Sequence, residues 1–211
     1  MRKLFFRNAA NFIVVARTLM IFIAIWLFIP VSAASRLAGA GILAAAALMD
    51  WLDGHVARKY AISSKLGGFL DTLGDRITEN LLLFFFAYEQ LIPLFVPLIF
   101  VARSFISDFV RHMNFLKGES TFSINRSLPG IIFVSSRTSR ALYLFLKFMV
   151  FFMGGAILVL DAGAFSNWQP LAVMLRTHLY SLSILLVVFN LLRFAFLIYD
   201  SRNILREEFM K

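Results

Sequence analysis

The sequence contains no cysteine and few charged residues, which make up 16% of its 211 positions. Without cysteine, the chain can form no disulfide bond, no thiolate metal site and no cysteine nucleophile. A soluble domain averages about 25% charged and about 45–50% apolar residues, whereas 60% of this chain is hydrophobic and phenylalanine alone contributes 25 residues. So much apolar surface cannot be covered in water, and it also excludes a disordered chain. The composition therefore predicts an integral membrane protein.

Six apolar runs are candidates for membrane-spanning helices. A hydrocarbon core about 30 Å thick needs about 20 mostly apolar residues per helix. The runs are Asn11–Ala33, Leu37–Trp51, Gly67–Tyr88, Leu91–Val110, Ala141–Leu160 and Leu179–Tyr199. We therefore expect one all-α membrane domain over residues 1–211, with a bundle of six transmembrane helices in residues 11–199.

The basic residues predict the orientation of this bundle. Lys and Arg number 21 against 12 Asp and Glu, and they gather in the N-terminal segment, in two connections between the apolar runs and in the tail, residues 200–211. Because such residues stay on the cytoplasmic side, we expect both termini on the cytoplasmic side of the membrane. We expect that membrane to be the inner membrane of a bacterium. Residues 1–10 are expected to lie on the lipid surface as an amphipathic helix. This topology accounts for the net charge of +9, so we expect no nucleic acid partner.

Four aspartates stand where a membrane protein has reason to avoid charge. Asp50 and Asp53 close the second apolar run, and Asp71 and Asp75 open the third. Offsets of three and four residues place each pair on one helical face. The short connection makes the two helices antiparallel, so the four carboxylates are expected to converge at the cytoplasmic boundary. Ionisable groups in such positions are costly and indicate function.

Oxygen ligands alone, without cysteine, are typical of a hard cation such as Mg²⁺, Mn²⁺ or Ca²⁺. Four carboxylates around two divalent ions have the composition of a two-metal site that acts on phosphates. The alternative is salt bridging to nearby basic residues, which are Arg58, Lys59, Lys65 and Arg76.

Small residues flank the four aspartates. Gly54 and Ala57 follow Asp53, and Gly67 precedes Asp71. Small side chains let a bulky ligand or another backbone approach closely, so a ligand groove and simple helix packing both remain open. Arg58 offers a fork of donors that matches a phosphate.

Residues 50–75 read DWLDGHVARKYAISSKLGGFLDTLGD. This segment resembles the signature of the CDP-alcohol phosphotransferase family, D-x2-D-G-x2-A-R-x8-G-x3-D-x3-D, with all eight defined positions present. The family also has a P-N-x-L-T-x2-R stretch at its first helix, where Asn11 and Arg17 match while Ala10 and Val14 replace Pro and Thr.

The resemblance implies a site for CDP-diacylglycerol and two divalent cations, Mg²⁺ or Mn²⁺. It implies that Asp75 is the general base. The implied metal ligands are Asp50, Asp53, Asp71 and Asp75. The implied nucleotide-binding residues are Asn11, Asp53, Gly54, Ala57, Arg58, Gly67 and Asp71. Family members are often homodimers, which implies a possible second copy as partner.

The acceptor alcohol is predicted from basic residues further along the chain. Arg103 and Arg111 lie eight residues apart and share a helical face, and Arg137 and Arg140 follow in the next basic group. A basic pocket suits an acceptor that carries its own phosphate. The resemblance implies glycerol 3-phosphate or inositol phosphate as phosphorylated acceptors, and of these we expect glycerol 3-phosphate. Inositol phosphate and unphosphorylated inositol, serine or choline are the alternatives within this chemistry. A transporter or divalent-cation channel, and a silent lipid-binding scaffold, are the alternatives outside it.

Overall fold

The computed structural model describes residues 2–60, 65–116, 127–163 and 165–209. Within these ranges, the side chains of residues 2–11, 50–60, 65–66, 114–116, 166, 203–204 and 207–209 lie outside the description. Side-chain statements below concern the other described residues.

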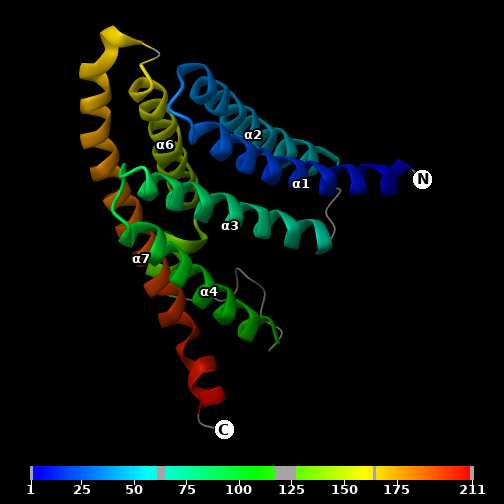
Figure 1. Cartoon of the computed structure of the whole chain (residues 1–211). Coiled ribbons are helices and arrows are strands. Elements are labelled where there is room, and N and C mark those ends of the chain that lie inside the picture. The colour runs from blue at the N-terminus through cyan, green and yellow to red at the C-terminus, as the bar shows by residue number, and fades with distance from the viewer. Residues whose placement is uncertain (1, 61–64, 117–126, 164, 210–211) are drawn as a thin grey trace. The chain divides into compact units, whose positions relative to one another are not determined.

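The described chain is helical and contains no strand (Figure 1). Its elements are α1 (Arg2–Phe28), α2 (Ala33–Tyr60), α3 (Lys65–Tyr88), α4 (Phe95–Leu116), α5 (Leu128–Gly130), η1 (Ile131–Ser135), α6 (Arg137–Asp161), η2 (Ser166–Trp168) and α7 (Gln169–Phe209). The predicted all-α class is confirmed. The expected surface segment 1–10 is continuous with α1, because that helix begins at Arg2, and α7 continues to Phe209 through the expected tail.

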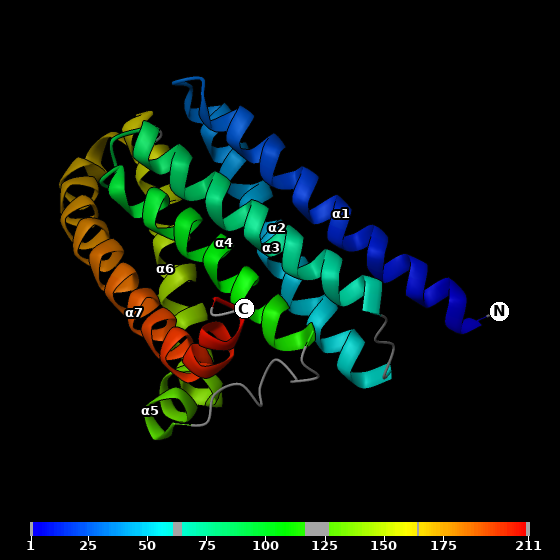
Figure 2. The ribbon, with the colours of Figure 1, turned by 90° about the horizontal axis from the view of Figure 1, so that it is seen from below.

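The first of two compact units comprises residues 1–91 and 151–177. In it α1 packs along both α2 and α3, as Figure 2 shows. Phe28 of α1 stacks on Phe85 of α3 with ring centroids 6.0 Å apart, and Phe86 lies 6.4 Å from Phe151 of α6. Gly154 makes this packing possible, because a Cβ there would lie 2.6 Å from the Phe86 ring.

The second unit comprises residues 92–150 and 178–211. Val110 of α4 packs with Leu197 of α7, and both are almost fully buried. Asp200 of α7 accepts hydrogen bonds from the backbone N–H and the hydroxyl of Ser127, at 3.3 and 3.0 Å. Ser127 in turn caps α5 by accepting from the Gly130 N–H. The start of α5 is thereby attached to α7.

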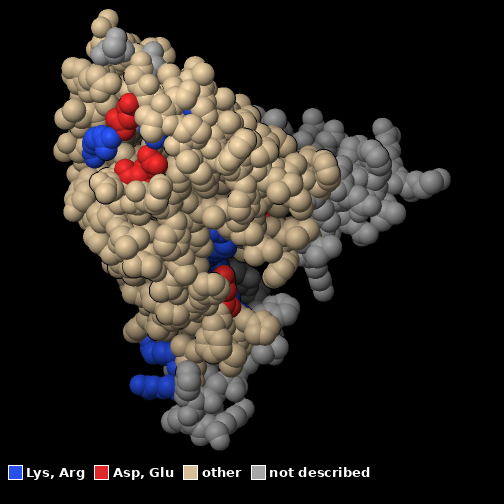
Figure 3. All heavy atoms as spheres, in the orientation of Figure 1, with Lys and Arg blue, Asp and Glu red and all other residues tan. Residues whose placement is uncertain are grey.

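The surface is rich in large apolar side chains. Phe12, Trp26, Phe105 and Val173 are each at least two-thirds exposed. On the face drawn in Figure 3, charged residues form small groups within an otherwise uncharged surface. Among the described residues, two helical segments are long and apolar enough to cross a membrane by length and composition, 137–161 and 169–202, and 12–28 and 33–49 are shorter apolar helices.

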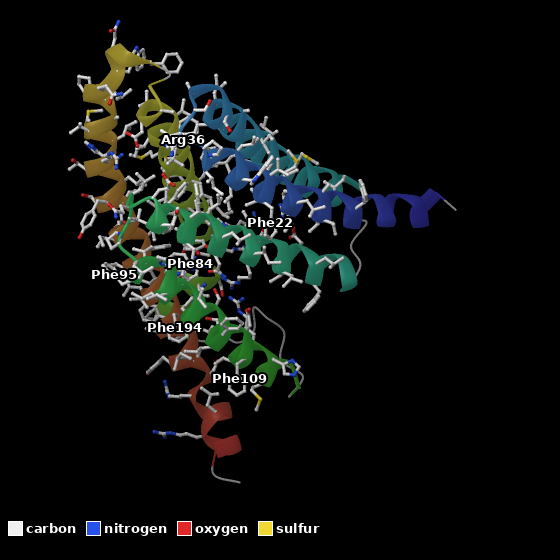
Figure 4. The ribbon with its side chains drawn as sticks, viewed as in Figure 1. Phe22, Arg36, Phe84, Phe95, Phe109 and Phe194 are labelled. Carbon is white, nitrogen blue, oxygen red and sulfur yellow. The ribbon has the colours of Figure 1, made fainter. Side chains whose placement is uncertain are left out.

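Arg36 joins the helix ends of the first unit (Figure 4). Its side chain is 4% exposed. It donates to the carbonyls of Phe28 and Leu158, at 3.0 and 3.1 Å, and to the Glu89 carboxylate at 3.2 Å. A buried charge is costly unless it is paired and hydrogen-bonded. This arginine therefore connects α1, α2, α6 and the residue that follows α3.

Candidate functional site

The predicted metal ligands divide between two helices of the first unit. Asp50 and Asp53 belong to α2, and Asp71 and Asp75 belong to the first half of α3. The side chains of Asp50 and Asp53 lie outside the described residues, as do those of four predicted nucleotide-binding positions, Asn11, Gly54, Ala57 and Arg58. The geometry of the site is therefore built from α1 and α3.

Asp71 and Asp75 both contact one nitrogen atom of Arg17. The Arg17 Nη2 donates to Asp75 Oδ1 at 2.9 Å and to Asp71 Oδ1 at 3.3 Å. The Arg17 side chain is 5% exposed, whereas those of Asp71 and Asp75 are 55% and 47% exposed. The two carboxylates thus turn toward a common point and still reach solvent, as a site for a soluble headgroup requires.

The close approach of α1 to α3 explains how Arg17 reaches these carboxylates. A Cβ at Gly74 would lie 2.9 Å from the Thr18 hydroxyl and 3.2 Å from Val14 Cγ1. Thr18 itself donates to the Val14 carbonyl within α1 at 2.9 Å. A side chain at position 74 would push the helices apart, so glycine there brings Arg17 within hydrogen-bond distance of Asp71 and Asp75.

The next turn of α3 carries a separate ion pair. Arg76 Nη1 donates to Glu79 Oε2 at 3.4 Å, and the Glu79 side chain is 3% exposed. The sequence analysis left open that Arg76 forms a salt bridge with the aspartates. In the structure Arg76 pairs with Glu79, and Arg17 pairs with Asp71 and Asp75.

The carboxylates suit a hard divalent cation. Their oxygens are the ligand type that Mg²⁺ and Mn²⁺ prefer, and two of them face one point within a single helical turn. Among the described side chains, no group of three or more His, Cys, Asp and Glu residues is close enough to hold an ion. The predicted quartet includes Asp50 and Asp53, which lie outside that part of the chain.

The predicted acceptor residues belong to the second unit. Arg103 is buried on α4, with 7% of its surface exposed, and Arg111 lies 3.7 Å from Asp108 on the same helix. Arg137 begins α6 with an exposed side chain, and Arg140 donates to the Ser136 carbonyl at 3.4 Å.

Arg193 of α7 is a candidate that the sequence did not single out. It donates to the Ser139 hydroxyl at 2.8 Å and to the Val134 carbonyl at 3.3 Å, and its guanidinium lies 5.3 Å from the centre of the Tyr143 ring. The positive charges of Arg111 and Arg140 act on Arg193. We name Arg111, Arg140 and Arg193 the arginine cluster. The sequence could have indicated Arg193, because it is a basic residue inside the last apolar run.

Asn190 and Ser107 of this unit have buried polar side-chain atoms without a hydrogen-bond partner among the described residues. Asn190 of α7 is fully buried, and neither its Oδ1 nor its Nδ2 has a hydrogen-bond partner among the described residues. The hydroxyl of Ser107 on α4 is in the same state. Both side chains lie on the faces through which α4 and α7 contact each other. Asn190 precedes Leu197 by about two helical turns, and Ser107 precedes Val110 by about one turn.

Comparison with known proteins agrees with the motif. The model of one protein family, CDP-alcohol phosphatidyltransferase, matches residues 7–199. A CDP-diacylglycerol–glycerol-3-phosphate 3-phosphatidyltransferase of Pseudomonas fluorescens is 41% identical over 70 residues, which are 33% of this chain and 36% of the relative. An archaetidylinositol phosphate synthase of Pyrococcus horikoshii is 36% identical over 99 residues, or 45% of this chain and 53% of the relative. A CDP-diacylglycerol–glycerol-3-phosphate 3-phosphatidyltransferase of Bacillus subtilis is 34% identical over 71 residues, which are 34% of this chain and 37% of the relative. The chain thus spans about a third to about half of the length of these relatives.

Proposed function

Because the chain belongs to the CDP-alcohol phosphatidyltransferase family, whose model covers residues 7–199, we propose that it transfers a phosphatidyl group from CDP-diacylglycerol to an alcohol and releases CMP. The observation that carries this proposal is that Asp71 and Asp75 of α3 both contact Arg17 of α1 and belong to a complete family motif. The relatives' names support the class of reaction.

Four aspartates, Asp50, Asp53, Asp71 and Asp75, would hold two divalent cations, Mg²⁺ or Mn²⁺. When bound, these ions stabilise the negative charge that develops on the pyrophosphate. The motif residues Gly54, Ala57, Arg58 and Gly67, with Asn11 of α1, would bind the cytidine and its phosphates. The exposed edges of Asp71 and Asp75 support a site that a water-soluble headgroup can enter.

Asp75 would act as the general base. It accepts the proton of the acceptor hydroxyl, and the oxygen forms a bond to the phosphorus on the lipid side of the pyrophosphate. The bond from that phosphorus to the bridging oxygen breaks, and CMP leaves with the electron pair. The reaction is thus a single displacement at that phosphorus.

Glycerol 3-phosphate is the acceptor that we propose. The names of the Pseudomonas and Bacillus relatives specify it, while the Pyrococcus name points to an inositol phosphate. Both carry a phosphate, and the arginine cluster, with Arg103 and Arg137 as further candidates, supplies charges that suit one. A phosphorylated acceptor therefore agrees better with these residues than free serine, choline or inositol does.

The proposed setting is the inner membrane of a bacterium, with six spans and with both termini and the site on the cytoplasmic side. The exposed apolar side chains of the described helices support contact with lipid. α3 and α4 carry charged residues such as Asp75 and Arg103, which explains why hydropathy alone does not select them. A homodimer is part of the same proposal.

The test uses purified protein in detergent with CDP-diacylglycerol, Mg²⁺ or Mn²⁺ and a set of alcohols. We expect CMP release that requires the metal and glycerol 3-phosphate, with the lipid product identified by mass. Asp53→Asn should abolish transfer by weakening metal binding. Full transfer in both Asp53→Asn and Asp75→Asn would remove the mechanism, and metal flux into liposomes without CMP release would favour a transporter.

A further inference from the structure

We infer that Arg17 positions Asp71 and Asp75 for divalent cations and remains bound to both carboxylates when the ions are present. This inference rests on the proposed function, because it assumes that these aspartates are metal ligands. It assigns Arg17 the role of a positioning residue, which acts through the carboxylates rather than on the substrate.

Arg17 contacts one oxygen atom of each carboxylate. Arg17 Nη2 donates to the Oδ1 atom of Asp71 and to the Oδ1 atom of Asp75, at 3.3 and 2.9 Å. A carboxylate has two oxygens and can accept several contacts at once. Ligation of a cation by either carboxylate is therefore compatible with its contact to Arg17.

Arg17 is buried where α1 packs against α3. Its side chain is 5% exposed, between α1 and α3. Its neighbours Val14 and Thr18 pack against α3 at Gly74, where the two helices lie so close that a Cβ would clash. An arginine in such a place stays charged, and moving it away would break its contacts to both carboxylates. Arg17 therefore fixes the positions of both carboxylates before an ion binds.

Two roles for Arg17 can be separated, because they have opposite effects on metal affinity. A residue that competes with the ions for the carboxylates lowers their affinity, so its removal would tighten binding. A residue that orients the ligands raises affinity, and removing the hydrogen-bond partner of a metal ligand typically weakens binding about 10–100-fold. The shared contact to both Oδ1 atoms and the burial of Arg17 favour the second role.

The experiment measures Mn²⁺ binding to the purified full chain without substrate, by the electron paramagnetic resonance signal of unbound Mn²⁺. For Arg17→Gln we expect an affinity about 10–100-fold below that of the unaltered protein. Equal or tighter binding in Arg17→Gln overturns the inference. If that variant does not fold, Arg17→Lys carries the test, since lysine lacks the planar fork of donors. There we expect about 10-fold weaker binding, and unchanged affinity overturns the inference.

Arg36→Gln is the matched control. It also removes a buried arginine that pairs with a carboxylate in the same unit, Glu89 at 3.2 Å. We expect it to lower the melting temperature and to leave Mn²⁺ affinity unchanged. If it weakens Mn²⁺ binding as much as Arg17→Gln, the effect reflects folding and the inference is wrong. If the unaltered protein binds no Mn²⁺, the proposed metal site fails as well, which distinguishes that failure from one confined to Arg17.

Discussion

Buried arginines and glutamates of the first unit are paired with opposite charges. Arg17 and Arg36 are 5% and 4% exposed and contact aspartate and glutamate, and Glu79, at 3%, contacts Arg76. In a medium of low dielectric constant an unpaired charge costs several kcal/mol (order of magnitude). The partners differ in one respect, because Asp71 and Asp75 remain about half exposed whereas Glu79 is buried. Asp71 and Asp75 are therefore accessible to a ligand from solution, whereas Glu79 is not.

Asp75→Asn tests the general base at the scale of one residue. The amide keeps the size of the side chain but cannot accept the proton, so we expect CMP release to fall by about 10²–10⁴-fold. Binding of a CDP nucleotide, measured by calorimetry with Mg²⁺ present, should stay within a few-fold of the unaltered protein, which is an order-of-magnitude expectation. A variant that retains full turnover would show that another group takes the proton.

At the scale of the element, α3 combines a polar first half with an apolar second half. Asp71 and Asp75 face Arg17 in the first half, and Leu82, Leu83 and Phe86 are fully buried in the second. Gly74 lies between the two aspartates and lets α1 approach. The packed half holds the helix in place, while the polar half presents the carboxylates.

Gly74→Ala should lower stability and activity together. The new Cβ would meet the Thr18 hydroxyl at 2.9 Å, and overpacking of this kind costs about 1–3 kcal/mol. We expect a lower melting temperature in detergent and weaker Mn²⁺ binding, because Arg17 moves with α1.

Gly68→Ala is the control for this change. It lies on the same helix, and a Cβ there meets nothing within 4 Å. Since alanine favours helix over glycine by about 0.5–1 kcal/mol, we expect equal or slightly higher stability. A melting temperature that falls equally in both variants would contradict the close-packing account.

The arginine cluster joins three helices, α4, α6 and α7, and it permits a test of the acceptor. Replacing Arg111, Arg140 or Arg193 singly by glutamine should raise the KM for glycerol 3-phosphate about 10-fold or more, since hydrogen bonds to charged groups contribute about 1.5–3 kcal/mol. The KM for CDP-diacylglycerol should change little. Arg202→Gln is a control, because that exposed arginine contacts Tyr199. Equal acceptor KM values in all four variants would exclude the cluster as the phosphate site.

At the scale of the whole molecule, large apolar side chains cover much of the described surface. Such a surface is unfavourable in water and favourable in lipid. The hydropathy of 137–161 and 169–202 is high enough for spanning, while the charges of α3 and α4 serve the proposed site. The six-span arrangement remains a prediction of the sequence.

The absence of cysteine permits a direct test of topology, because any introduced thiol is the only one in the chain. We expect Ser32→Cys and Asn167→Cys to react with a membrane-impermeant maleimide in intact cells. His112→Cys and Arg202→Cys should react only after the cells are permeabilised, since the basic connections are predicted to be cytoplasmic. All four positions are exposed. Labelling of the second pair in intact cells would reverse the proposed orientation.

The sequence by itself determined the helical class and the family, because both depend on local patterns. Apolar runs and the motif from Asp50 to Asp75 are complete within short stretches of chain. Only the tertiary structure decided that Arg17 donates hydrogen bonds to Asp71 and Asp75, which are 54 and 58 residues away. The same holds for the hydrogen bond from Arg193 to Ser139. Such contacts depend on the rotation and register of packed helices, which side-chain spacing along one helix does not specify.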